Sequence, residues 1–301
     1  MRLRQFATLD VFTITRFAGN PLAVVLDADG LDTDAMQAIA REFNLSETVF
    51  VFPPVDPLRR AGLRIFTPAR ELPFAGHPTV GTAVLLSLID DHRGAGELVL
   101  EEQVGPIRCR TRPSVVDAGG YAEFDLPRLP SHEADAGDRG AMARALGLAP
   151  EDIGAADWPA ESWSAGNPFV FVPLTSLDAA RRCRVDLALF EDAFKVTGRA
   201  AAFVFSREAA MPGHDFHARM FAPSFGMIED PATGSAVAAF AGYLGAHGGY
   251  ADGDHLVRIE QGVEMGRPSL MDLRMTMGGG KLIAASIGGN AVRVCQGTLH
   301  E

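Results

Sequence analysis

Three titratable residues are of the types that exchange protons near neutral pH, and each lies in a distinctive short motif. Glu47 lies in NLSETVFVF, His77 in FAGHPTVGTA and Asp230 in EDPATGSA. Two carboxylates and an imidazole form a set that can move a proton between carbon atoms by general acid–base catalysis. Taken alone, a glutamate between a helix and a strand is more often an exposed loop charge. Glu47 therefore depends on its surroundings for a catalytic role.

His77 and Asp230 precede two segments that share one pattern. Each is followed at once by proline, then by glycine and a small hydroxyl residue, and then by an apolar run. We expect helices over Pro78–Ile89 and Pro231–Leu244, with proline at the first helical position and His77 and Asp230 at the N-caps. Histidine is a poor capping residue, which indicates chemistry at that position. Both segments are apolar on nearly every face, as is typical of a helix buried inside its domain.

The first turns of these helices carry small residues, at Gly81–Ala83 and Gly234–Ala236. Free backbone N–H groups and the positive end of the helix dipole suit such a terminus to binding an anion, and small side chains let a ligand approach. We therefore expect the carboxylate of a small substrate to bind there. The alternative is that both termini are simply caps on two core helices.

The sequence repeats itself at the scale of half the chain. Three signatures recur in the same order and at similar spacing: Ala18–Leu26 and Ala165–Leu174 (AGNP), Arg64–Pro68 and Arg219–Pro223 (RIFTP, RMFAP), and His77–Ala83 and Asp230–Ala236. A weaker echo relates EEQVG to IEQGV. We infer two homologous halves, 1–115 and 116–287, with the boundary near Pro113 and the Gly119–Gly120 pair.

Strands dominate the remaining pattern. Asp32–Phe43 has the periodicity of an amphipathic helix, and strands are predicted over Thr48–Phe52, Leu98–Glu101, Phe169–Val172 and Ala202–Phe205. Because helices and strands do not alternate regularly, the sequence predicts an α+β fold rather than a doubly wound parallel sheet.

The composition excludes several classes of function. The chain has 301 residues and a net charge of −11, which argues against a nucleic-acid partner. Its three cysteines are widely spaced and predict neither a zinc site nor a disulfide framework. The sequence shows no signal peptide and no membrane-spanning run, so we expect a cytoplasmic protein with no membrane partner.

Two other motifs are assigned structural roles. His214 and His217 in GHDFHARMF suggest a metal, but the alternation predicts a strand with solvated polar positions, and we expect no metal site. MGGGK at Met277–Lys281 lacks the spacing of a phosphate-binding loop and is expected to turn the chain between strands.

The motifs described above, together with DVFT, LSETVFV and QGVEMGRPS, resemble the phenazine-biosynthesis PhzF-like family of the diaminopimelate-epimerase-like superfamily, over nearly the whole chain. The resemblance implies two pseudo-symmetric domains, each a curled, mostly antiparallel, barrel-like sheet around a central helix. It places the active site in the cleft between them and implies that the C-terminal strand, 288–301, completes the first domain. It also implies a homodimer without metal or organic cofactor.

The same resemblance assigns roles to residues. Glu47 matches the family's proton shuttle, and His77 and Asp230 match its accompanying histidine and aspartate. The substrate-binding candidates are Asn20, Ser46, Gly76, Thr233, Gly234 and Ser235. Related two-thiol racemases carry a cysteine at each helix start, and this chain has none there, which excludes their mechanism.

The expected function is therefore a cofactor-independent isomerase. It would move a proton between carbons of a small, anionic amino or hydroxy acid. In phenazine producers the family isomerises a dihydro-hydroxyanthranilate, but that substrate does not carry over from the motifs. The alternatives are an amino-acid epimerase or racemase of the same fold and a non-catalytic homologue that only binds small molecules.

Overall fold

The computed structural model describes residues 2–91, 94–113, 118–154, 158–196 and 198–300. Its contacts divide the chain into two compact units: unit 1 is Met1–Pro127 with Gly288–Glu301, and unit 2 is Arg128–Ile287. The boundary predicted at residues 115 and 116 lies outside the described residues. The strands that flank it, β7 (Gly105–Pro113) and β8 (Gly119–Asp125), pair antiparallel within unit 1. The chain therefore leaves unit 1 later than predicted, after Pro127.

Unit 1 is a closed barrel of eight strands. Around the ring, each strand pairs with the next and the last returns to the first: β1 (Leu3–Val11), β2 (Asn20–Val25), β3 (Glu47–Phe52), β4 (Ala61–Phe66), β6 (Gly96–Glu102), β7, β8 and the part of β17 (Lys281–His300) that belongs to unit 1. The pairs β2–β3 and β4–β6 are parallel. A short strand, β5 (Glu71–Leu72), pairs with β4. The C-terminal residues thus complete the sheet of unit 1 through the β1–β17 pair.

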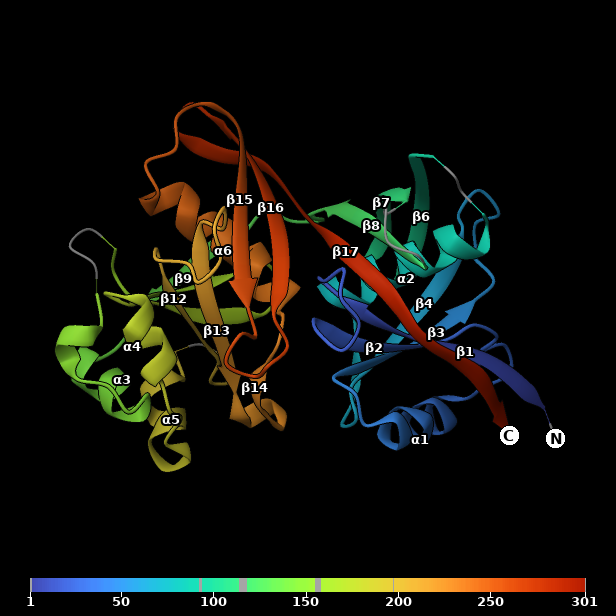
Figure 1. Cartoon of the computed structure of the whole chain (residues 1–301), viewed down its shortest axis with the longest axis horizontal. Coiled ribbons are helices and arrows are strands. Elements are labelled where there is room, and N and C mark those ends of the chain that lie inside the picture. Colours follow the sequence, from blue (N-terminus) through green and yellow to red (C-terminus); the bar gives the residue numbers. More distant parts are fainter. Residues whose placement is uncertain (1, 92–93, 114–117, 155–157, 197, 301) are drawn as a thin grey trace. The chain divides into compact units, whose positions relative to one another are not determined.

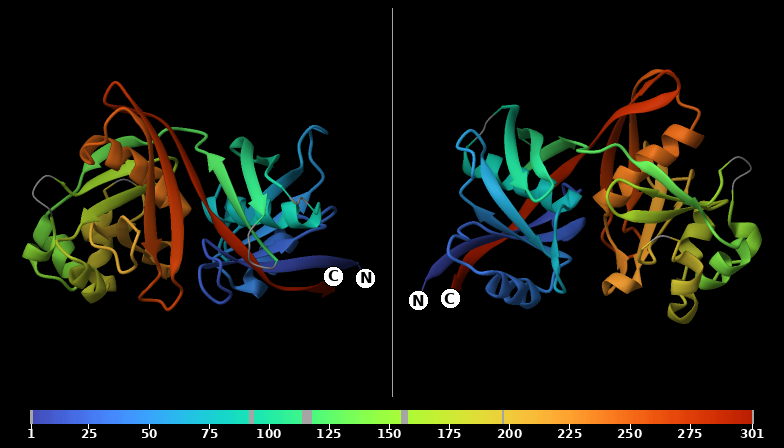
Figure 2. Two further views of the ribbon diagram at one scale, coloured as in Figure 1. Left: turned by 45° about the horizontal axis from the view of Figure 1, so that its top comes forward. Right: turned by 180° about the vertical axis from the view of Figure 1, so that it is seen from behind.

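The barrel surrounds one helix, α2 (Gly76–Ile89), which Figures 1 and 2 show inside the ring of strands. Every residue from Gly76 to Ser87 is buried, as the uniformly apolar sequence predicts. A Cβ at Gly81 would lie only 2.6 Å from a methyl carbon of Leu22 and 2.7 Å from one of Val11. Glycine at this position therefore lets α2 pack directly on β1 and β2.

The predicted amphipathic helix is confirmed as α1 (Thr33–Phe43), on the outside of the unit 1 barrel. Its N-cap is Asp32, whose carboxylate accepts a hydrogen bond from the Ala35 N–H, and it buries Met36 and Ala40 against the sheet. It ends at Asn44 in the left-handed conformation, and the chain then enters β3.

Unit 2 repeats the strand order of unit 1. Its strands are β9 (Ser131–Asp135), β10 (Glu161–Ser164), β11 (Pro168–Pro173), β12 (Ala202–Ser206), β13 (Phe216–Ala222), β14 (Met227–Asp230), β15 (Gly253–Gln261) and β16 (Ser269–Gly278). The pairs from β10 to β16 have the same directions as those from β1 to β7, including parallel β11–β12 and β13–β15. The duplication in the sequence is therefore a duplication of topology.

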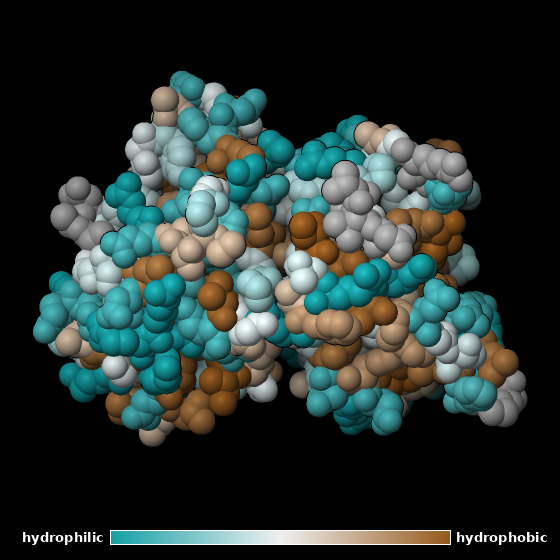
Figure 3. All heavy atoms as spheres, viewed as in Figure 1, coloured by the Kyte–Doolittle hydropathy of each residue, from teal (hydrophilic) through white to brown (hydrophobic). Residues whose placement is uncertain are grey.

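The buried helix of unit 2 is α6 (Gly234–His247), which packs on strands that include β10, β11 and β16. Three further helices, α3 (Arg139–Ala145), α4 (Leu177–Arg182) and α5 (Leu187–Phe194), and the short turns η1 (Pro150–Asp152) and η2 (Pro223–Phe225) belong to the same unit. Helices α3, α4 and α5 lie together beside the sheet (Figures 1 and 2). Figure 3 shows a largely hydrophilic surface over α3 and α4.

The four predicted strands are confirmed as parts of β3, β6, β11 and β12. The Met277–Lys281 segment turns between β16 and β17, with Gly279 and Gly280 both in the left-handed region. Strand dominance with few helices confirms the α+β class. Within the described residues, no helix is long and apolar enough to span a membrane.

Candidate active site

Helix α2 begins two residues earlier than the sequence pattern predicted. Ala75 is the N-cap, in extended conformation, so Gly76 and His77 are the first two helical residues and Pro78 is the third. The prediction that His77 is the N-cap is therefore wrong by two positions. The backbone N–H groups of a helix's first turn have no intrahelical acceptor, and those of Gly76 and His77 lie in that turn. Proline at the third position has no N–H to satisfy.

Glu47 and His77 meet in unit 1. Glu47 is the first residue of β3, opposite Leu22 in the parallel strand β2, and not a loop residue. Its Oε2 lies 3.3 Å from Nε2 of His77. The side chains are only 13% and 5% exposed, so the contact is shielded from water. The fold thus brings together two of the three proposed acid–base residues, which are 30 positions apart in the chain.

Burial determines the charge of His77. It lowers the pKa of His77 to about 3, and a hydrogen bond to the backbone of Pro21 offsets this only in part. The imidazole is therefore neutral near pH 7 and carries a single N–H. Because Nε2 has no hydrogen bond within the described residues, the bond to Pro21 uses the other ring nitrogen. Nε2 consequently presents a lone pair to Glu47.

The AGNP motif holds the His77 ring through its hydrogen bond to the backbone of Pro21. Asn20 begins β2 and is fully buried, and Pro21 follows it. Gly19, just before, has φ of 66°, and a Cβ there would lie 2.3 Å from the Val11 carbonyl oxygen. Only glycine can make this turn, which brings the Pro21 backbone to His77. Ser46, directly before Glu47, is half-buried.

Asp230 belongs to unit 2 and ends β14. Its side chain is nearly buried, and its Oδ2 accepts a hydrogen bond from the Thr233 hydroxyl at 2.5 Å. Thr233 is the N-cap of α6, and Gly234 and Ser235 are its first two residues. Predicting Asp230 as the cap is therefore wrong, because α6 begins one turn later.

A glutamine that the sequence analysis did not identify explains the delayed start of α6. Nε2 of Gln261 donates to the Asp230 carbonyl at 2.7 Å, and its Oε1 accepts from the Thr233 N–H at 3.2 Å. Without Gln261, the Asp230 carbonyl and the Thr233 N–H would be available for the hydrogen bonds of an additional helical turn. Because the amide satisfies both, the chain between Asp230 and Thr233 stays non-helical. The weak echo of EEQVG in IEQGV marked this stretch of sequence, but it aligns Gln261 with Gln103 and not with Glu102, one residue earlier.

The polar residues of β13 are buried, contrary to the prediction of solvated positions. Nδ1 of His217 lies 2.7 Å from Glu260, and its Nε2 lies 3.1 Å from Glu264. His214 contacts the other oxygen of Glu260 at 2.6 Å. Burial acts to lower the pKa of His217, but the two carboxylates outweigh it and raise the pKa to about 9. Both ring nitrogens are thus occupied by an ion cluster inside unit 2.

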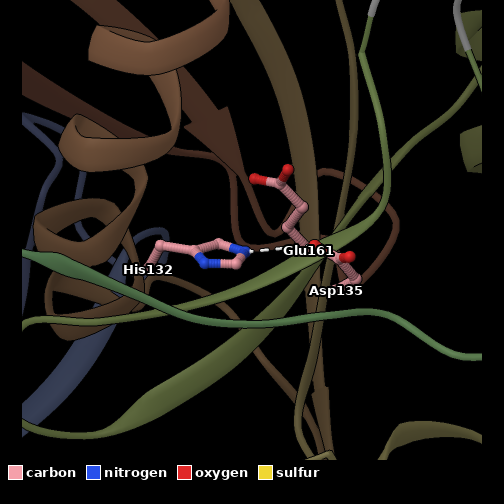
Figure 4. Close-up of side chains that lie close together, drawn as sticks. All are labelled: His132, Asp135 and Glu161. Atoms are coloured by element: carbon pink, nitrogen blue, oxygen red, sulfur yellow. Dashed lines mark ion pairs between the residues drawn. The ribbon is translucent and has the colours of Figure 1, made fainter.

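One group of side chains among the described residues has the types and spacing of metal ligands: His132, Asp135 and Glu161, on β9 and β10 (Figure 4). His132 lies 3.4 Å from Asp135, whose side chain is 89% exposed. Oε2 of Glu161 accepts from the Trp163 indole at 2.8 Å and lies 2.9 Å from His247. The exposure and these existing partners are typical of a surface polar cluster.

Comparisons with known proteins agree along the whole chain. The family described as phenazine biosynthesis-like protein, PhzC-PhzF, matches residues 9–297. The chain is 50% identical over 302 residues to an uncharacterized isomerase of Mesorhizobium japonicum, covering 99% of each. It is 38% identical over 307 residues to trans-2,3-dihydro-3-hydroxyanthranilate isomerase of Pseudomonas fluorescens, again covering 99% of each. The solved PhzF-family phenazine biosynthesis protein of Bacillus anthracis has a TM-score of 0.90 at 27% identity, covering 100% of both chains.

Proposed function

The chain belongs to the PhzC-PhzF family and is an isomerase, and we propose that Glu47, His77 and Asp230 carry out its proton transfer. The reaction moves a proton between two carbon atoms of a small substrate that bears a carboxylate, without a cofactor. The observation that carries this proposal is the buried contact of 3.3 Å between Glu47 and His77.

The protonation states of Glu47 and His77 define the proposed role of Glu47 as the proton carrier. The neutral His77 donates to the Pro21 backbone and presents a lone pair to Glu47. When the Glu47 carboxylate removes a proton from a substrate carbon, the resulting acid can donate a hydrogen bond to Nε2 of His77. Because burial keeps His77 a weak base, the proton remains on Glu47 and is returned to another carbon. Substrate and product then have the same atoms, and no other reactant is needed.

The helix starts supply the substrate-binding groups of the proposal. The first-turn N–H groups of Gly76 in α2, and of Gly234 and Ser235 in α6, are suited to a carboxylate. Asp230 is proposed to orient a polar group of the substrate and to adjust its protonation, with the Thr233 hydroxyl fixing its carboxylate.

Two further side chains complete the proposed binding set. Asn20 is buried at the start of β2, next to Pro21, and Ser46 directly precedes Glu47. Both therefore flank the residues that form and support the Glu47–His77 contact, and we propose that they bind polar groups of the substrate.

A substrate screen in deuterated water tests the proposed function. Small cyclic and acyclic amino and hydroxy acids are incubated with the enzyme and analysed by mass spectrometry and chiral chromatography. The panel includes trans-2,3-dihydro-3-hydroxyanthranilate, the compound that appears in the name of the Pseudomonas fluorescens relative. We expect deuterium at a new carbon position in a structural isomer. Inverted configuration without a structural change would instead identify an epimerase, and calorimetric binding without exchange would identify a non-catalytic binder.

We also propose that the enzyme is a cytoplasmic homodimer, as its sequence and family resemblance imply. Light scattering after size-exclusion chromatography is expected to give twice the chain mass, and cell fractionation to place the enzyme in the cytoplasm. A monomer in solution, or recovery with membranes or secreted proteins, would contradict these expectations.

A further inference from the structure

One position is polar, buried and equivalent in both units: Glu102 ends β6, and Gln261 ends β15. The equivalence follows from the strand register. Gly62 in β4 and His217 in β13 are equivalent, because each lies two residues before the arginine of the repeated motif, RIFTP or RMFAP. Gly62 pairs with Glu101, and His217 pairs with Glu260. The residues that follow, Glu102 in β6 and Gln261 in β15, therefore occupy equivalent positions. Their exposed fractions are 8% and 0%.

Each of these side chains reaches the start of the central helix in its own unit. Gln261 binds the Asp230 carbonyl and the Thr233 N–H, directly before α6. Glu102 reaches α2 through a hydroxyl group: its Oε1 lies 2.7 Å from the Thr79 Oγ1, which lies 2.8 Å from the carbonyl of the N-cap Ala75. Both therefore hold the backbone directly before or at the start of the helix.

The hydrogen bonds of the Thr79 hydroxyl bear on the protonation of Glu102. A hydroxyl has one hydrogen and can donate one full hydrogen bond. If the Thr79 hydroxyl donates to the Ala75 carbonyl, the 2.7 Å contact with Glu102 needs a proton from Glu102. Oε2 of Glu102 is buried and has no hydrogen-bond partner within the described residues. Within the described residues, a carboxylate there would be a buried charge with the Thr79 hydroxyl as its one hydrogen-bond donor, which is costly.

We infer that Glu102 is a neutral carboxylic acid that positions the start of α2, and hence His77, as the amide of Gln261 positions Asp230. A protonated glutamate and a glutamine have nearly the same shape, and each can donate a hydrogen bond toward the helix start, which a carboxylate cannot. Glu102 is thus a positioning residue for the proposed proton transfer, and its catalytic consequence rests on the proposed function.

The surroundings of Glu102 favour the neutral form. Burial raises the pKa of Glu102 to about 8, and the Thr79 hydroxyl offsets this only in part. The group that faces it from β7 is the thiol of Cys109, whose own pKa burial raises. On α2, the nearest titratable residue along the chain is His77, neutral near pH 7.

Thermal unfolding as a function of pH tests the protonation of Glu102 without any substrate. In the unfolded chain the carboxyl ionises above about pH 4.3, whereas the folded protein keeps its proton up to about pH 8. The unfolded state therefore binds fewer protons in this interval, and Glu102 lowers stability as pH rises. E102Q removes this effect, so its Tm relative to wild type is expected to increase from pH 5 to pH 8. A constant or decreasing Tm difference would overturn the inference.

Two leucine variants test the positioning role. E102L keeps side-chain bulk without hydrogen bonds, and Q261L is the matched change in unit 2. The His77 ring resonances in ¹H–¹⁵N spectra are expected to move in E102L and to remain in place in E102Q and Q261L. With an identified substrate, kcat is expected to fall in E102L and to be retained in E102Q. A folded E102L with unchanged His77 resonances overturns the positioning role, whereas absent turnover in wild type contradicts only the proposed function.

Discussion

At the scale of single residues, two buried histidines show how opposite surroundings produce opposite charges. His77 contacts one glutamate, and its burial away from water dominates its pKa, so the imidazole is neutral. His217 is also buried but lies between two carboxylates and is protonated. The first arrangement suits a group that accepts a hydrogen bond from a proton carrier. The second suits a fixed ion pair that holds β13 and β15 together.

We predict that neither histidine titrates near pH 6.5. His77 is expected to remain neutral down to about pH 4.5 and His217 to remain protonated up to about pH 8, because their pKa values lie near 3 and 9. Ring ¹H–¹⁵N spectra recorded between these pH values measure this directly, with H77Q and H217Q providing the assignments. A titration midpoint near 6.5 for His77 would remove the argument that it keeps the proton on Glu47.

The charge of His217 also has a consequence for stability. A histidine whose pKa is raised on folding contributes stability that is complete below pH 6.5 and is lost as pH rises toward 9. We therefore expect H217Q to lose more Tm relative to wild type at pH 6 than at pH 9. An equal loss at both values would mean that packing, and not charge, accounts for the effect.

At the scale of elements, the turn between β1 and β2 connects backbone geometry to the proposed site. Gly19 and Gly249 both have φ of 66°, but a Cβ at Gly19 would collide with the Val11 carbonyl, whereas one at Gly249 meets nothing within 4 Å. The two positions separate the cost of a left-handed residue from the cost of a steric clash.

We expect G19A to be the more destabilising of the two substitutions. G249A adds only left-handed strain, about 1–2 kcal/mol. G19A adds a clash with backbone that cannot move cheaply, so its loss in unfolding free energy is expected to be larger by about 1–3 kcal/mol. It also displaces Pro21, which bonds His77. Urea unfolding measures both losses, and equal values would show that the close approach to Val11 is not restrictive.

Elements were more predictable from sequence than the contacts that set their ends. The repeated motifs, the period of α1 and the β-rich runs each depend on neighbouring residues, and they predicted α1, four strands and the duplication. The predicted starts of α2 and α6 were both wrong. For α6 the reason is Gln261, which is distant along the chain and binds the backbone directly before the helix. The burial of the polar side chains of β13 was also missed, because the partners of His217 are Glu260 and Glu264, which are distant along the chain.

At the scale of the whole molecule, the same topology is built twice and the copies carry different chemical groups. The unit 1 copy places His77 inside the first turn of its central helix, beside Glu47. The unit 2 copy places Asp230 before its helix, held by Thr233 and Gln261. The sequence motifs identified both positions, but only the three-dimensional structure shows that Glu47 and His77 are in contact.

The charge of the whole chain predicts how salt affects the enzyme. With a net charge of −11, the overall field repels an anionic substrate, and the helix starts must attract it locally. We expect kcat/KM for an anionic substrate to rise as ionic strength increases to about 0.15 M, where the Debye length is about 8 Å. A neutral amide of the same substrate is the control. A decrease for the anion would show that a local positive field dominates its approach.

Deuterium transfer by a Glu47 variant tests the central claim most directly. E47Q preserves the shape of the side chain and its place beside His77 but cannot accept a proton from carbon. Wild type is expected to incorporate deuterium from solvent into the product at a new carbon. E47Q is expected to bind the substrate, as measured by calorimetry, and to incorporate none. Incorporation by E47Q at the wild-type rate would contradict the assignment of Glu47 as the proton carrier.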